Sequence, residues 1–321
     1  MFDRNALKTK SLSARKHDMD ISVIRELNSP ISINSRRFET FDLIAEYMVR
    51  ARADGASIIM MLGAHVIRSG VQKYIIDLME RGYISCLAMN GACIIHDFEL
   101  AMIGATTESV SCYIAEGQFG LWKETGIINE IIHSAYDANH SVGMGEAIGK
   151  AIEEGDYPYK DTSLLAASYR QRIPATVHVG IGYDIIHELP NCDGAATGAL
   201  SYNDFLRFVS VVQDVEGGIA MNMGSAVMAP EIFLKALSMA RNVAHQKGHT
   251  ITNFVTLVCD LHDLPKDVSQ EPPKGNADYY YRPWKTMLVR TVSNGGKSYY
   301  VQGNHAETIP SLWKAINDLE K

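Results

Sequence analysis

Two short apolar runs, each stopped by glycine, constrain the fold of this chain more than any other feature. Residues 58–62 read IIMML and stop at Gly63-Ala64-His65, and residues 84–89 stop at Asn90-Gly91-Ala92. A helix-like stretch to about Arg81 separates the two runs. This alternation predicts a βαβ unit whose parallel strands are buried on both faces. Ligands of such sheets bind outside the carboxyl ends of the strands, so the polar residues behind each run are the first candidates for function.

The same alternation continues toward the C-terminus. Short strands are expected at 176–180, 218–223 and 254–258, with helical patterns between them. The expected fold class is therefore α/β, with a mostly parallel sheet flanked by helices in a Rossmann-like arrangement. Residues 1–35 are polar and are interpreted as an N-terminal arm, and residues 36–321 as a single α/β domain.

Composition excludes several classes of protein. The chain has 321 residues, 46% of them hydrophobic, which is enough for a large core. Its net charge of −7 and the lack of a basic stripe argue against nucleic acid as a partner. No apolar run approaches the roughly 18 residues of a membrane span. Five cysteines without a C-x-x-C pair, and an N-terminus without the apolar core of a signal peptide, predict reduced thiols and a cytoplasmic protein.

Two further polar clusters carry side chains suited to chemistry. His96-Asp97-x-Glu99 is suited to acid–base catalysis or to metal binding, or it begins a helix that Asp97 caps. Around the strand end at residue 180 lie His178, Asp184 and His187, of which Asp184 is favoured as an acceptor for a hydroxyl or ammonium group. None of these histidines is spaced from another as H-x-x-x-H or H-x-H, so no metal ligands are assigned.

Two segments remain to be placed. The stretch 189–200 is rich in Gly, Ala, Asn and Asp and is expected to be a loop, followed by a helix over 201–212. The run 279–285, YYYRPWK, is suited to a cation or nucleotide pocket, although an edge strand with alternating burial is preferred.

Taken together, these stretches resemble deoxyhypusine synthase, a family that uses NAD to oxidise spermidine and then moves the aminobutyl group to a lysine of a translation factor. The resemblance covers about residues 40–315. It lies in the order and character of the segments: Gly63–Gly70, which is similar to the family's first nucleotide-contacting loop, and then Asn90-Gly91-Ala92 with His96-Asp97, Thr125–Asn129 and Gly180–Asp184.

The resemblance implies NAD as cofactor and a site at the strand ends. Within this hypothesis, His65, His96 and Asp184 are the candidate catalytic residues, and Asp97 and Glu99 are the candidate substrate-binding residues, because paired carboxylates suit an ammonium group. The expected cofactor-binding residues are Gly63, Ala64, Ser69, Asn90, Gly91, Ala92, Gly180, Gly182, Gly224 and Ser225. It also implies a homo-oligomer, a dimer or tetramer, acting on a small-molecule substrate.

One departure from the family pattern is large. After the strand at 218–223, where the resemblance implies a lysine that forms an imine with the aminobutyl group, this chain reads Gly224-Ser225-Ala226-Val227 and has no lysine. Without an amine the imine cannot form at that position. The leading hypothesis is therefore an NAD-dependent transferase or oxidoreductase, divergent from deoxyhypusine synthase, that acts on a small substrate, an amine by resemblance, without the lysine–imine step.

Two alternatives belong to other classes. One is a metal-assisted hydrolase, built from a set of five side chains: His65, His96, His178, Asp184 and His187. The other is a non-catalytic nucleotide-binding subunit that supports an active homologue.

Overall fold

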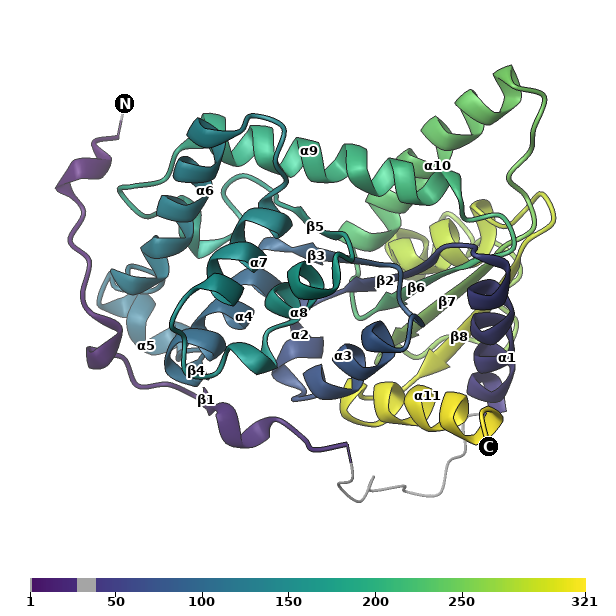
Figure 1. Cartoon of the computed structure of the whole chain (residues 1–321), viewed down its shortest axis with the longest axis horizontal. Coiled ribbons are helices and arrows are strands. Elements are labelled where there is room, and N and C mark those ends of the chain that lie inside the picture. The colour runs from purple at the N-terminus through teal and green to yellow at the C-terminus, as the bar shows by residue number, and fades with distance from the viewer. Residues whose placement is uncertain (1, 28–38) are drawn as a thin grey trace.

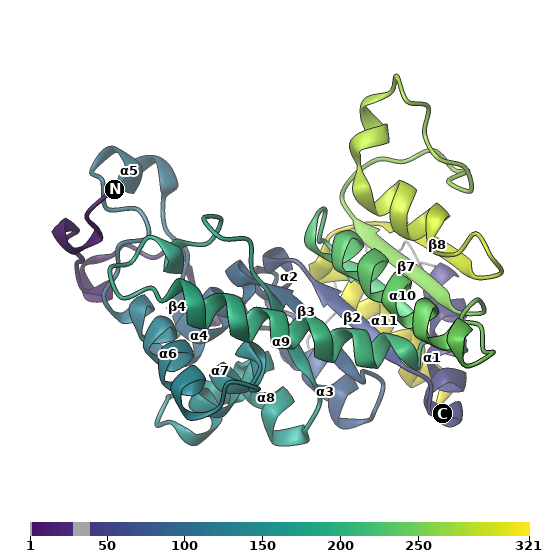
Figure 2. The same ribbon diagram turned by 90° about the horizontal axis from the view of Figure 1, so that it is seen from above.

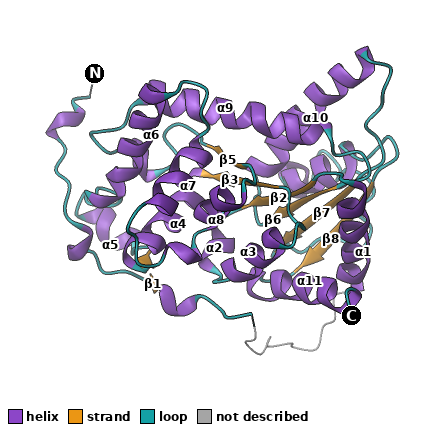
Figure 3. Cartoon of the chain, in the orientation of Figure 1, coloured by secondary structure: helices purple, strands orange, loops and turns teal. Residues whose placement is uncertain are grey.

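A computed structural model describes residues 2–27 and 39–321 (Figure 1). The boundary expected between residues 35 and 36 lies outside the described residues. The body of the molecule is a parallel sheet with helices on both faces, which confirms the α/β class (Figure 3).

Six parallel strands form the main sheet, in the order β5-β3-β2-β6-β7-β8. Numbered by their sequence in the chain, the strands run three-two-one-four-five-six across the sheet, which is the order of a Rossmann fold. In this sheet Ile59 of β2 is paired with Cys86 of β3, and Ile58 of β2 is paired with Ile219 of β6. Their bounds are β2 Ile58–Leu62, β3 Cys86–Asn90, β5 Ala175–His178, β6 Ile219–Met223, β7 Val255–Asp260 and β8 Lys297–Gln302.

Alternate residues of β2, at the centre of the sheet, face two separate hydrophobic cores. Met60 and Leu62 pack into the core beneath α1, α3, α4 and α11, whereas Ile59 and Met61 pack against α9 and α10. Figure 2 shows α9 and α10 lying along the sheet. The helices are α1 Glu39–Asp54, α2 Ala64–Arg68, α3 Gln72–Glu80, α4 Gly91–Ile103, α5 Val110–Ala115, α6 Ile127–Ala138, α7 Met144–Glu154, α8 Leu164–Gln171, α9 Gly194–Gln213, α10 Met228–Gln246 and α11 His305–Leu319. None of the helices in the described part of the chain combines the length and apolar character that crossing a membrane requires.

The N-terminal arm runs along the outside of the body as short turns (Figure 1). Its turns are η1 Arg4–Ala6, η2 Leu12–Ala14 and η3 Ile21–Val23, and its strand β1 Met19–Asp20 pairs with β4 Ala105–Thr106. Gly70 has no room for a side chain, because a Cβ there would overlap the carbonyl of Val23. The arm is therefore ordered by packing on the body.

Two expectations from the sequence are wrong. The run 279–285 is not an edge strand: it spans the turn η7 Ala277–Tyr280 and the start of a π-helix, η8 Pro283–Arg290. Proline suits a first helical turn. The stretch 189–200 is a loop only at its start, because Asp193 caps α9 by accepting hydrogen bonds from the backbone N–H of Ala195 and Ala196.

Candidate functional site

The strand order reverses between β2 and β6, and this switch point is where a Rossmann sheet opens to a ligand. Gly63, at the end of β2, packs so closely on the next loop that a Cβ would overlap the carbonyl oxygen of Gly224. Gly224 itself has φ +68°, in the left-handed region that favours glycine. A Cβ on Gly224 would overlap the imidazole Nε2 of His305. The two glycines and His305 thus meet at the switch point.

The loop after β6 is held by a buried amide of the strand itself. Asn222 Oδ1 accepts from the backbone N–H of Ser225 at 2.9 Å, and Asn222 Nδ2 donates to the Ser225 carbonyl at 2.9 Å. The Ser225 hydroxyl accepts from the N–H of Ala229 at 3.0 Å, in the first turn of α10. Ser225 is therefore buried and fixed, with its hydroxyl proton still available to a ligand.

A cavity of about 350 Å³ opens beside the carboxyl end of β3. It brings together His96, Asp184, Ala92 and Glu99, all expected from the sequence, with Arg15 of the arm and Arg68 of α2. A second cavity of about 250 Å³ shares Tyr183, Asp184 and Ile185 with the first and adds Gly182 and His187. The loop after β5 therefore separates two adjoining hollows, with Asp184 lining both.

His96 has a defined tautomer in this site. Its Nδ1 lies 2.8 Å from the hydroxyl of Thr106, and that hydroxyl donates its single proton to Glu99 at 2.8 Å. Thr106 must therefore accept from Nδ1–H, which leaves Nε2 as the nitrogen with a free lone pair. Burial lowers the pKa of His96 to about 4, so the ring is neutral near pH 7. A neutral imidazole with a free Nε2 is suited to accept a proton.

Asp184 reaches across from the loop after β5 to the first residue of α4. Its carboxylate lies so close to Gly91 that a Cβ at position 91 would overlap both carboxylate oxygens. Burial raises the pKa of Asp184 to about 6. The carboxyl group is thus placed at the end of β3, beside the helix N-terminus, and changes charge near neutral pH.

Asp184→Asn is expected to stabilise the ligand-free protein at pH 8 by about 1–3 kcal/mol. The raised pKa means that the folded state favours the protonated carboxyl of Asp184. The ionised carboxylate therefore lowers the free energy of unfolding at pH values above about 6, whereas below the ordinary pKa of 3.8 the group is protonated in both states and has no such effect. The gain should disappear at pH 3.5–4 (about the unfolded pKa). Urea unfolding at both pH values measures it, with the exposed Asp263→Asn as control; an equal gain at both pH values would contradict the assignment.

The structure corrects the expectation that Asp97 binds substrate. Asp97 is 1% exposed, and its two oxygens accept from the Ser163 hydroxyl at 2.5 Å and from the backbone N–H groups of Leu164 and Leu165 at 2.9 and 3.2 Å. It therefore holds the N-terminus of α8. It does not cap its own helix either, because α4 begins at Gly91 with Asn90 as N-cap.

Glu99 is also engaged within the protein rather than free for an ammonium group. Arg15 donates to both of its oxygens at 3.0 and 2.6 Å, and the hydroxyls of Thr106 and Thr125 donate at 2.8 and 2.7 Å. Four donors occupy the lone pairs of the carboxylate. Glu99 thus lines the cavity as one half of a buried ion pair.

The other expected residues are divided between backbone and side-chain roles. His65 is exposed on the short helix α2, and its charge would act on both His96 and His305. The Ser69 hydroxyl donates to the His65 carbonyl at 2.7 Å, and Asn90 Oδ1 accepts from Cys93 N–H at 3.0 Å. The remaining positions offer only backbone or a methyl group to a ligand: Gly63, Ala64, Gly91, Ala92, Gly180, Gly182 and Gly224.

The five side chains of the hydrolase hypothesis do not form one cluster. His178 lies within β5, where its Nε2 contacts the Thr176 hydroxyl at 2.9 Å and its ring packs edge-on to Phe208. Within residues 2–27 and 39–321, no group of three or more His, Cys, Asp or Glu side chains is placed to hold a metal ion.

Two residues of interest were missed by the sequence analysis. Arg15 comes from the arm, and only the fold brings it to Glu99. His305 begins α11, and the pattern Asn304-x-x-Glu307, typical of a helix start, was a signal that could have revealed it. Lys285, the last residue of the run 279–285, is 5% exposed, and its ammonium lies 3.8 Å from the ring centre of Tyr279.

Comparisons with known proteins agree with the fold. Residues 42–152 match the family model "Arginine dihydrolase ArgZ-like, C-terminal, Rossmann fold". A protein of Archaeoglobus fulgidus named "Probable deoxyhypusine synthase 1" is 26% identical over 134 residues, which are 42% of this chain and 39% of that protein. The chain thus matches well under half the length of this curated relative.

Two solved structures share the fold at low sequence identity. The ternary complex of AgrE with ornithine and NAD⁺ is 15% identical with a TM-score of 0.51, and the match covers 90% of this chain and 34% of AgrE. A conserved LOR/SDH protein from Methanococcus maripaludis is 17% identical with a TM-score of 0.52, covering 92% of this chain and 74% of that protein. The comparisons confirm the resemblance to deoxyhypusine synthase over part of the chain, and the solved structures share its fold.

Proposed function

We propose that this chain binds NAD along the carboxyl edge of its sheet and acts on a small substrate, an amine by resemblance to deoxyhypusine synthase. The observation that carries the proposal is the glycine-lined switch point between β2 and β6. Gly63 and Gly224 have no side chains there, so a ligand can approach the backbone closely. The fold shared with AgrE, whose complex holds ornithine and NAD⁺, supports it.

The residues of this edge fit a dinucleotide. In Rossmann folds a carboxylate near the end of the second strand accepts hydrogen bonds from the ribose hydroxyls. Here Asn90 stands at that end and its side chain caps α4, whereas Asp184 supplies a carboxylate against Gly91 from another loop. Asp184 would hold the ribose, and Arg68, which lines the same cavity, would balance a phosphate charge.

The side chains of the cavity divide the remaining work. Bound NAD supplies a hydride acceptor. His96 would take a proton at Nε2 from a substrate ammonium or hydroxyl, with Thr106 and Glu99 fixing its ring through Nδ1. Glu99, paired with Arg15, would stabilise the protonated imidazole, since an opposite charge nearby favours the charged form.

An imine on a lysine behind β6 is not part of the proposal. Lys235, the first lysine after that strand, is exposed on α10 and paired with Glu231. The proposed activity is therefore an amine oxidoreductase or a transferase without that covalent step. A homo-oligomer, dimer or tetramer, is proposed from the resemblance alone, and light scattering on the purified chain tests it.

The test of catalysis is amine-dependent formation of reduced nicotinamide, followed by its absorbance. His96→Gln should lower the rate by about 10²-fold or more, because loss of a general base commonly costs that much. The exposed His249→Gln is the matched control and should leave the rate unchanged. Tight NAD binding with no turnover on any amine would contradict the catalytic proposal and favour the non-catalytic subunit.

A further inference from the structure

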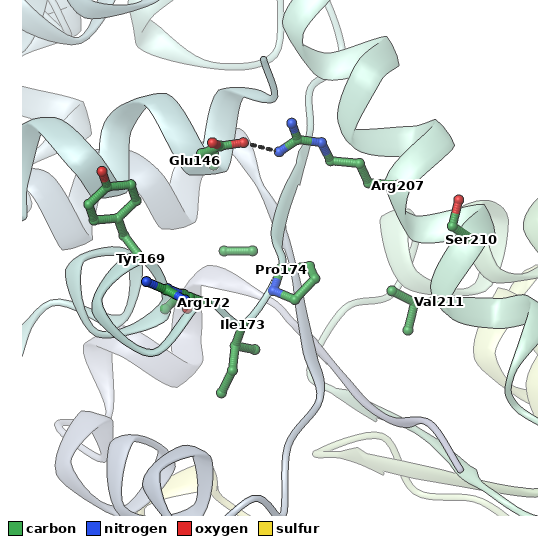
Figure 4. Close-up of a pocket in the computed structure, with 11 residues that line it drawn as sticks. Glu146, Tyr169, Arg172, Ile173, Pro174, Arg207, Ser210 and Val211 are labelled. Atoms are coloured by element: carbon green, nitrogen blue, oxygen red, sulfur yellow. Dashed lines mark hydrogen bonds and ion pairs between the residues drawn. The ribbon is translucent and has the colours of Figure 1, made fainter. Parts of the chain in front are cut away.

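A cavity of about 440 Å³ lies at the amino end of β5, whereas the candidate site lies at the carboxyl ends of the parallel strands (Figure 4). Ala175, the first residue of β5, contributes to its wall, together with the first turn of α7, the end of α8 and the last two turns of α9. None of the residues assigned to NAD or substrate lines it. A ligand bound here would occupy a separate site.

The charged groups of this cavity leave one positive charge uncompensated. Arg207 of α9 forms an ion pair with Glu146 of α7, shown as a dashed line in Figure 4. Arg172 lines a different wall, and its guanidinium has no hydrogen-bond or ion-pair partner among the described residues. The pair cancels to zero, so the wall presents a net charge of about +1, which matches a monoanion rather than a phosphate dianion.

The backbone of Arg172 is unusual as well. It ends α8 with φ +58°, and only it and Thr107 have positive φ among the described non-glycine residues. Glycine is the ordinary residue at such a helix end, since a side chain is strained there. Arg172 thus keeps a side chain at a position where glycine is ordinarily favoured, and that side chain lines the cavity.

Apolar groups complete the cavity. Ile173, Pro174 and Val211 form part of the lining. A planar guanidinium matches a carboxylate with two parallel hydrogen bonds. A cavity of this size is in the range that holds small molecules.

We propose that this cavity is a binding site for a small monocarboxylate with an apolar chain. Arg172 binds the carboxylate, and Ile173, Pro174 and Val211 contact the chain. The Glu146–Arg207 pair closes one wall and excludes a second negative charge. The site is independent of NAD and of the proposed reaction.

Calorimetry on the full chain with isovalerate tests the proposal. Saturable binding is expected, and isovaleramide, which has the same shape without the charge, should bind about tenfold more weakly or worse, since hydrogen bonds between charged groups are worth roughly that factor or more. Arg172→Gln should reduce isovalerate affinity by a similar factor, and Arg172→Lys should restore part of it. Arg170→Gln, two residues away and outside the cavity lining, is the matched control.

Three results would overturn the proposal. These are no saturable binding of isovalerate by the wild-type chain, equal binding of acid and amide, and an Arg172→Gln variant that binds as tightly as the Arg170→Gln control. Circular dichroism and thermal unfolding establish that each variant is folded. Because Arg172 is exposed, all of these substitutions should leave the fold intact.

Discussion

Arg15→Met is expected to destabilise the protein by about 3–5 kcal/mol, because it leaves a buried carboxylate without its cation. Arg15 and Glu99 are 5% and 1% exposed, and their two parallel hydrogen bonds join the N-terminal arm to α4. The hydroxyls of Thr106 and Thr125 remain on Glu99 but carry no charge. Urea unfolding at pH 7 measures the loss.

The surface pair Lys10–Glu116 provides the control for this prediction. Both side chains are more than half exposed, with 55% and 52% of their surface accessible. Lys10→Met, on the same arm, should therefore change stability by less than about 1 kcal/mol. Arg15→Met combined with Glu99→Leu should recover much of the loss, because replacing both members of a buried pair by apolar residues is often neutral. Equal losses of stability in Arg15→Met and Lys10→Met would contradict the conclusion that the buried Arg15–Glu99 pair holds the arm on α4.

Gly63→Ala is expected to damage both folding and NAD binding. The added Cβ would overlap the carbonyl oxygen of Gly224, a backbone group that cannot swing aside as a flexible side chain would. The β2–α2 and β6–α10 loops must then separate, at the point where the proposal places the dinucleotide. We expect the free energy of unfolding to fall by about 2–4 kcal/mol, at or above the usual cost of overpacking a core. We also expect no measurable NAD binding.

Gly198→Ala is the matched control. Gly198 lies within helix α9, and a Cβ there meets nothing within 4 Å. Alanine in a helix interior should stabilise the protein by about 0.5–1 kcal/mol. If Gly63→Ala behaved like Gly198→Ala, with unchanged NAD affinity, the close approach of the two loops would not be part of the site.

The strands were predictable because buried parallel strands are continuous apolar runs. The run 58–62 coincides with β2, and 218–223 differs from β6 by one residue. The Rossmann strand order could not be predicted from the sequence, because it depends on which strands pair across long separations in the chain. The prediction for 279–285 was wrong because its aromatic residues favour a strand, whereas Pro283 begins a π-helix that packs against β7 and β8.

The candidate site was predictable in location but not in the roles of its acids. His96 and Asp184 line one cavity, as their positions behind strands suggested. Asp97 and Glu99 have their partners 66 and 84 residues away in the chain, at Ser163 and Arg15, and no local pattern reports such contacts. His96-Asp97-x-Glu99 therefore combines one candidate base with two residues that hold the structure in place.

NAD binding to the full chain, stripped of endogenous ligand and measured by calorimetry at pH 8, tests the central claim most directly. The account predicts saturable binding by the wild type and a loss of about tenfold or more in Asp184→Ala, since that variant lacks the charged acceptor for the ribose hydroxyls. Asp263→Ala, an exposed loop carboxylate, should bind as the wild type does. Absence of binding by the wild type, or equal binding by Asp184→Ala, would contradict the assignment of this edge of the sheet to NAD.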